Sequence, residues 1–130
     1  MIVTLYRVGR NLNRAYRTCE AFGVTRMECV DCTGDVHGNL FAAAGHVDVA
    51  QLDTWPNLES GLALETFHAL PIWKVDWQRV ERIVIGGETA GLPRKLQVGQ
   101  TAVIPMFGRV SGLTVEAALA IALHEWRRCG

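Results

Sequence analysis

Residues 82–93, RIVIGGETAGLP, join a short apolar run to a loop with three glycines. A glycine-rich turn after a strand is typical of phosphate sites, because its bare N–H groups can surround an anion. This stretch contains Glu88 but no lysine, and its glycine spacing fits neither the P-loop nor the dinucleotide pattern. The three glycines are Gly86, Gly87 and Gly91. Because a carboxylate beside the loop disfavours polyphosphate, we expect a cationic or neutral ligand.

Arginines recur near the start of the chain. Arg10, Arg14 and Arg17 stand at the helical spacing i, i+4, i+7, and Arg7 precedes them. Such a row forms one positively charged ridge, and the planar fork of arginine matches phosphate oxygens. The ridge therefore fits an RNA backbone; the alternative is a solvated charged face without a function.

Other chemical groups are less informative. Cys29 and Cys32 form a C-x-x-C in a stretch that reads as a strand, and no second ligand pair follows at zinc spacing. We therefore expect thiols buried in a strand and no metal site. Trp73 and Trp77 have rings that can stack on a base, although tryptophans at this spacing are more often core or interface residues.

The elements that must position these groups alternate along the chain. Strands are predicted at residues 1–8, 26–33, 46–52, 62–67, 82–86 and 101–107, and helices at 13–22, 39–45 and 113–128. Gly23 marks the end of the first helix. This order predicts an α/β fold, with a mostly parallel sheet covered by helices on both faces. No repeat or linker interrupts the chain, so we expect one domain over residues 1–130.

Composition narrows the class of protein. The 130 residues are 49% hydrophobic, carry a formal net charge of zero and include four cysteines. The hydrophobic content excludes a disordered chain. Because the net charge is zero, no overall positive charge attracts the protein to nucleic acid. The N-terminal residues lack the features of a signal peptide, and the longest apolar run is too short and too charged to span a bilayer. We expect a cytoplasmic protein with reduced thiols and no membrane contact.

The last predicted helix is apolar around nearly its whole circumference, which requires burial on more than one side. Thr114 is its expected N-cap, and Glu116 falls in the first turn, where the helix dipole favours negative charge. In a domain this small, the second buried side is as likely to face another subunit as the chain's own core. We predict a homodimer with this helix at the interface, the alternative being a central core helix.

Four stretches together resemble the SpoU/TrmH class of the SPOUT superfamily of S-adenosylmethionine-dependent RNA methyltransferases. They are residues 11–24, NLNRAYRTCEAFGV; 62–65, LALE; 83–92, IVIGGETAGL; and 103–125, VIPMFGRVSGLTVEAALAIALHE. They occur in the family's order and near its spacing, whereas residues 33–61 resemble it only loosely. The chain is similar to minimal members with a single SPOUT domain, which act on tRNA.

The resemblance implies a C-terminal deep trefoil knot, a rare exception to the usual rules of chain connection. It also implies that S-adenosylmethionine binds within the knot, in a pocket built largely from the backbone of three loops. The corresponding residues are Leu64, Glu65, Gly86, Gly87, Glu88, Gly91, Ile104, Met106, Gly112 and Leu113. On this interpretation, the glycines let the ligand lie against the main chain, and acidic groups suit a sulfonium cation.

The reaction implied by the resemblance is methyl transfer to a ribose 2′-hydroxyl, of tRNA or alternatively of rRNA. Arg17 matches the family's catalytic arginine and Asn11 the asparagine that opens the same motif. Arginine is an unusual base because it stays protonated in water up to a pKa of about 12. Arg17 is therefore either a base activated by its surroundings or a group that orients the hydroxyl. Arg7, Arg10 and Arg14 are the candidate RNA contacts.

The chain departs from the family's pattern at two motifs. Gly112, Leu113 and Thr114 stand where the family usually has Ser-Leu-Asn, and Asn13 stands where it has glycine. Thr114 can replace part of the lost hydrogen bonding, and we assign it to the catalytic residues. A pocket made of backbone tolerates such changes better than catalysis does. The alternative function is therefore a non-catalytic RNA-binding or regulatory homologue that keeps the cofactor pocket.

Overall fold

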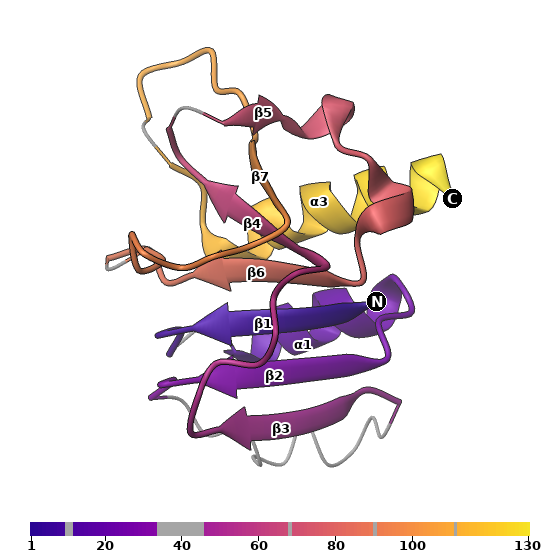
Figure 1. The fold of residues 1–130 in the computed structure, drawn as a ribbon, viewed down its shortest axis with the longest axis vertical. Helices are drawn as coiled ribbons and strands as arrows, with labels where there is room; N and C mark the ends of the chain where they lie inside the picture. The colour runs from indigo at the N-terminus through magenta and orange to yellow at the C-terminus, as the bar shows by residue number, and fades with distance from the viewer. Residues whose placement is uncertain (10–11, 34–45, 68, 90, 111) are drawn as a thin grey trace.

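The computed structural model describes residues 1–9, 12–33, 46–67, 69–89, 91–110 and 112–130 (Figure 1). The predicted order of strands and helices is confirmed in these ranges. The elements are β1 (Ile2–Tyr6), α1 (Leu12–Ala21), β2 (Arg26–Val30), β3 (Asp48–Leu52), β4 (Gly61–Glu65), β5 (Leu70–Pro71), the 3₁₀ turns η1 (Ile72–Lys74) and η2 (Trp77–Arg79), β6 (Arg82–Gly86), β7 (Gln100–Val103) and α3 (Val115–Cys129). None of the described helices is long and apolar enough to cross a membrane.

The described strands form one sheet in the order β3-β2-β1-β6-β4-β7-β5, and every neighbouring pair is parallel. The α/β fold with a parallel sheet is therefore confirmed. β1, β2 and β3 follow one another outward from the centre in chain order, whereas the other half has the order β6, β4, β7, β5, which departs from the order along the chain. All strands end at the same edge of the sheet, on the left in Figure 1. In such sheets, ligands bind beyond this edge.

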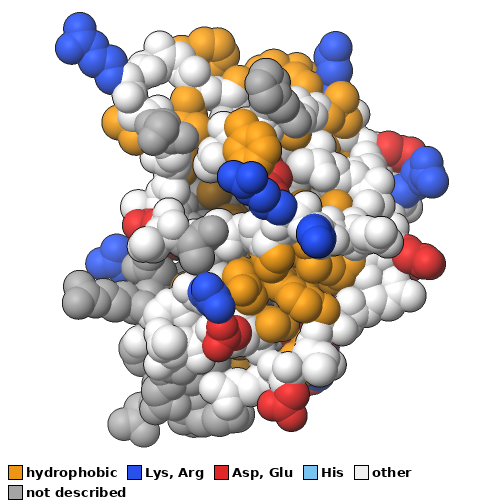
Figure 2. All heavy atoms as spheres, turned by 60° about the vertical axis from the view of Figure 1, so that its left-hand side comes forward, with side chains coloured by type: hydrophobic (Ala, Val, Ile, Leu, Met, Phe, Trp, Pro, Cys, Tyr) orange, Lys and Arg blue, Asp and Glu red, His pale blue; other side chains and the backbone are white. Residues whose placement is uncertain are grey.

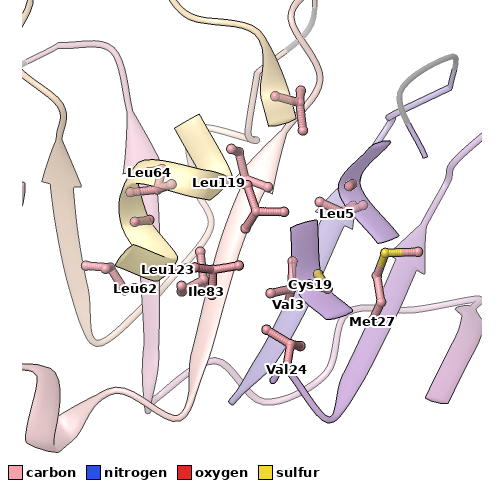
Figure 3. Close-up of a cluster of buried hydrophobic side chains, with 14 of the residues drawn as sticks. Val3, Leu5, Cys19, Val24, Met27, Leu62, Leu64, Ile83, Leu119 and Leu123 are labelled. Atoms are coloured by element: carbon pink, nitrogen blue, oxygen red, sulfur yellow. The ribbon is translucent and has the colours of Figure 1, made fainter. Parts of the chain in front are cut away.

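Helices α1 and α3 contact each other on one face of the sheet (Figure 1). Because side chains alternate along a strand, every second strand residue points to these helices. Figure 3 shows the resulting core, in which strand side chains meet Cys19 of α1 and Leu119 and Leu123 of α3. α1 ends as predicted: Gly23 adopts φ 72°, and the N–H of Val24 donates to the carbonyl of Cys19.

The opposite face is crossed by residues 53–60, which lead from β3 to β4 (Figure 1). Trp55 in this segment lies against Tyr6 of β1, with ring centroids 5.0 Å apart. The predicted helix at residues 39–45 lies outside the described residues. Helical cover of this second face therefore stays a prediction.

A buried ion-pair network crosses the same face. The carboxylate of Glu28, on β2, accepts hydrogen bonds from Arg26, from Arg82 on β6 and from the hydroxyl of Thr4 on β1. Arg82 also donates to the Thr4 hydroxyl at 2.7 Å, and Arg26 pairs with Asp48 on β3. The network joins four adjacent strands, and its centre is away from water because Glu28 is 6% exposed and Thr4 fully buried. Burial raises the pKa of Glu28, but the hydrogen bonds from the two arginines outweigh it and hold this pKa below its usual value.

Replacing Glu28 by glutamine should lower the free energy of unfolding by about 3 kcal/mol at pH 7, because it leaves buried arginine charge without its partner. The difference from the wild type should shrink as the pH falls below about 4.3, since a carboxylate with a depressed pKa loses its contribution when it takes up a proton. Urea unfolding curves measured across this pH range provide the check.

The matched control is Asp48→Asn, which removes a carboxylate whose side chain is 67% exposed from the same network. It should cost about 1 kcal/mol or less. Equal losses for the two variants would show that burial of Glu28 is not what makes its ion pairs important.

Candidate functional site

A cavity of about 1180 Å³ opens at the edge of the sheet where β4, β6 and β7 end. Its walls are the ends of these three strands, the loops that follow them and the first turn of α3. Hydrophobic side chains gather on this side of the molecule, with separate basic and acidic side chains around them (Figure 2). Small-molecule sites typically measure roughly 300–1000 Å³, so the cavity has room for a nucleoside-sized ligand and for part of a second reactant.

The ten residues assigned to the cofactor from the sequence all line this one cavity. They are Leu64, Glu65, Gly86, Gly87, Glu88, Gly91, Ile104, Met106, Gly112 and Leu113. Thr114, assigned to catalysis, lines it too. The three loops meet because β6, β4 and β7 are neighbours in the sheet, although β5, η1 and η2 separate β4 from β6 along the chain.

Two of the loop glycines have a different role from the expected one. A Cβ on Gly87 would lie well inside 3.0 Å of the Arg7 carbonyl oxygen, and a Cβ on Gly86 would lie 2.7 Å from the Gly91 carbonyl oxygen. A side chain at either position would therefore collide with the protein's own backbone, although both glycines line the cavity. Gly91 has φ 64° and meets the need for a left-handed residue in the turn. Gly112 has open space beside it, as the sequence interpretation requires.

The charged side chains in the described lining are Glu65, Glu88 and Arg94. Glu65 is the last residue of β4 and is half-buried, whereas Glu88 and Arg94 are exposed. Burial raises the pKa of Glu65 above its usual value, because a carboxylate loses hydration inside the cavity wall. The lining thus combines apolar walls with one partly desolvated carboxylate.

The start of α3 lies at the cavity. Thr114 occupies the predicted N-cap position, and its carbonyl accepts the N–H of Ala118 at 3.0 Å, but its side chain makes no capping hydrogen bond. The expectation that its hydroxyl caps the helix is therefore wrong. The Thr114 side chain is exposed, and its hydroxyl remains available to a ligand.

The described arginines of the predicted ridge, Arg7, Arg14 and Arg17, do not line the cavity. Arg7 pairs with Asp31 at 2.8 Å, and both residues have positive φ, at 53° and 50°. Arg14, on α1, donates to Glu116 in the first turn of α3 at 3.2 Å. Arg17 lies one turn further along α1 and is exposed. Two of these arginines therefore have carboxylate partners within the chain.

Arg10 and Asn11, assigned to RNA binding and catalysis, lie outside the described residues. Their positions relative to the cavity stay predictions.

Several lining residues were missed by sequence reasoning. Thr66 and Phe67 follow directly after Glu65, Arg94 follows the glycine loop, and Val110 lies between Met106 and Gly112. Each of these residues adjoins a stretch that the sequence analysis assigned to the site. This adjacency is the signal that could have identified them. Phe67 and Val110 are exposed, at 62% and 70%, so the cavity has apolar side chains at its edge.

The cysteines and tryptophans that the sequence singled out differ in burial. Cys29 is buried in β2, as expected, and both cysteines are free thiols. Cys32 was expected in the same strand, but β2 ends at Val30, Asp31 adopts φ 50°, and Cys32 is half-buried beyond the strand. Among the described residues, no group of three histidine, cysteine or acidic side chains has a geometry that would hold a metal ion. Trp77 is buried, whereas Trp73 is 53% exposed.

Comparison with known proteins identifies similar chains. The pattern of the SpoU rRNA Methylase family matches residues 1–124. No curated protein sequence matches the chain.

Similar solved structures cover nearly all of this chain. A TrmH/SpoU tRNA modifying enzyme from A. aeolicus has a TM-score of 0.81 and 22% identity over 98% of this chain and 73% of its own. The SpoU methyltransferase AviRb from Streptomyces viridochromogenes, solved with AdoMet, has a TM-score of 0.84 and 20% identity over 99% and 60%. A structure reported for the 2-OH methylation of C/U34 on tRNA has a TM-score of 0.82 and 21% identity, over 98% of this chain and 93% of its own. The chain thus spans about three fifths of AviRb but nearly all of the third protein.

The backbone contact at Gly87 leads to a test. Gly87→Ala should lower the free energy of unfolding by about 1–3 kcal/mol, because the new methyl group collides with the backbone of Arg7, which cannot rotate away. Gly112→Ala is the control: its Cβ would lie 3.9 Å from the Thr66 methyl carbon, an ordinary contact. Thermal unfolding of both variants decides, and an unchanged melting temperature for Gly87→Ala would contradict the role assigned here.

Proposed function

Because this chain belongs to the SpoU rRNA Methylase family, we propose that it transfers a methyl group from S-adenosylmethionine to a ribose 2′-hydroxyl of RNA, with tRNA as the substrate. The observation that carries the proposal is that ten positions separated along the sequence, and matched to the family's cofactor loops, line a single cavity. Similarity to the structure described by 2-OH methylation of tRNA, which this chain nearly spans in length, supports the choice of substrate.

The residues present fit the proposed methyl donor. Leu64, Ile104 and Met106 provide apolar wall for a nucleoside, and the adjoining loops expose backbone groups to its polar edges. The half-buried carboxylate of Glu65 suits a ligand that carries a positive charge. S-adenosylmethionine supplies an activated methyl group when bound. The knot that the family resemblance implies is part of this proposal, since such a knot would hold the three loops in one place.

The chain's own side chains provide positioning on the RNA side. Arg17 is exposed on α1. The guanidinium of an arginine donates hydrogen bonds and accepts none. We assign Arg17 the role of holding the ribose hydroxyl or its neighbouring phosphate, which aligns the reacting oxygen. Arg14, one turn away, adds a phosphate contact. The Thr114 side chain makes no capping hydrogen bond and lies at the cavity. We assign its hydroxyl to hydrogen-bond to the ribose that accepts the methyl group.

The homodimer also belongs to the proposal. Val115, Leu119, Ala122 and Leu123 of α3 face the chain's own core. The other side of the helix carries Ala117, Ala120 and Ile121, which are half-buried or exposed within one copy. Covering this small apolar side against a second copy is favourable because it removes more apolar surface from water. A dimer also offers a route for Arg17 to reach a cavity, since Arg17 does not line the cavity of its own chain.

Transfer of labelled methyl from S-adenosylmethionine to bulk tRNA tests the activity. Arg17→Ala should reduce the rate by at least about 100-fold through loss of alignment, while the affinity for S-adenosylmethionine stays within about twofold. Arg79→Ala, at an exposed arginine on η2, is the control and should leave the rate unchanged. Tight cofactor binding without transfer by the wild type would instead favour a non-catalytic RNA-binding homologue, which the altered loop at residues 112–114 makes the second candidate.

Sedimentation or light scattering tests the dimer. The wild type should have twice the mass of one chain, and Ile121→Glu should shift it to the monomer because it introduces charge into an apolar interface. Gln51→Glu, on the opposite edge of the sheet, should remain dimeric. A monomeric wild type at micromolar concentration would refute this part of the proposal.

A further inference from the structure

Glu65 combines two properties that bear on which form of the ligand the cavity binds more tightly. It lines the cavity at the end of β4, and it is half-buried rather than exposed like the other acidic lining residue, Glu88. Burying a carboxylate without a paired charge is unfavourable. Among the described residues, Glu65 makes no ion pair, although Glu28 on β2, in the other half of the sheet, has two arginine partners.

The groups around Glu65 offer little compensation. Its register partner on β7 is Val103, and β6 ends beside it at Gly86, so both strand neighbours are uncharged. α3 contributes Val115 and Ala118 to the lining. The titratable or charged groups of the described lining besides Glu65 are Glu88 and Arg94, and both extend into solvent. The negative charge of Glu65 is therefore available to a ligand in the cavity.

We propose that Glu65 makes the cavity selective for a cationic ligand, so that it binds the sulfonium form of the methyl donor more tightly than the demethylated thioether. This inference rests on the proposed function. The two ligands, S-adenosylmethionine and S-adenosylhomocysteine, differ by one methyl group and one positive charge. Tighter binding of the sulfonium form favours release of the demethylated product and binding of fresh donor.

The physical basis is electrostatic and needs no hydrogen bond. A sulfonium has no N–H or O–H to donate, so its attraction to a carboxylate depends on distance and on the surrounding dielectric. Partial burial strengthens that attraction, because less water screens it. The apolar walls bind both ligands alike, which leaves the charge as the distinguishing feature.

Calorimetric titration of the purified protein with each ligand at pH 8 provides the test. Glu65→Gln should weaken binding of S-adenosylmethionine about tenfold and change binding of S-adenosylhomocysteine by less than about twofold. Glu81→Gln is the control: it removes an exposed carboxylate that does not line the cavity, and solvent screening should keep both affinities within about twofold of the wild type. Thermal unfolding verifies that each variant is folded.

A second measurement uses the unchanged protein. Because burial raises the pKa of Glu65, its carboxylate takes up a proton at a higher pH than an ordinary glutamate. Preference for the sulfonium ligand should therefore be full at high pH and decrease as the pH falls through this pKa. The Glu65→Gln variant should show a preference that is small and independent of pH over the same range.

The outcomes separate the inference from the proposed function. An unchanged ratio of affinities in Glu65→Gln, or an equal loss in Glu81→Gln, overturns the role of Glu65 while leaving the methyltransferase proposal intact. Failure of the wild type to bind either ligand overturns both.

Discussion

The parallel pairing of β1 with β6 is the interaction on which the rest of the structure depends. β1 begins the half that contains α1, β2 and β3, whereas β6 belongs to the half with β4, β7 and α3. Three contacts hold the junction: α1 packs on α3 on one face, Arg82 reaches Glu28 on the other, and the N–H of Gly87 donates to the Tyr6 carbonyl at 2.8 Å. A shift of one residue in this register would turn core side chains to the wrong face and separate Arg82 from Glu28.

The same junction determines the shape of the candidate site. The loop after β6 starts against the end of β1 and folds back, so that the N–H of Gly91 donates to the carbonyl of Gly87 at 2.9 Å. Its glycines allow backbone to contact backbone, which sets the cavity wall in place before any ligand arrives. The cavity then lies beyond the ends of three adjacent parallel strands, where α/β sheets commonly bind ligands. A site built from backbone in this way tolerates side-chain changes such as those at residues 112–114.

The chain has no net charge, and its buried and half-buried carboxylates differ in their partners. The buried carboxylate of Glu28 is paired, whereas the half-buried carboxylate of Glu65 faces the cavity. Glu116 links the first turn of α3 to Arg14 on α1. This pair connects the loop at residues 112–114, at the cavity, to the helix that carries Arg17. The arrangement gives the two proposed functional regions a direct structural connection.

The sequence by itself determined the alternation of strands and helices and the end of α1 at Gly23, and its resemblance to a known family indicated the loop residues that line the cavity. These features are encoded locally, in the hydrophobic period, in glycine conformation and in short motifs. Only the tertiary structure revealed that β1 and β6 are neighbours, that Arg82 pairs with Glu28 54 positions away, and that Arg14 meets Glu116 102 positions away. It also revealed the short β5, η1 and η2, which have too few residues for a recognisable period, and the backbone contacts that explain Gly86 and Gly87. Contacts between distant segments depend on the path of the whole chain and on which surfaces it buries together, and no local pattern records that information.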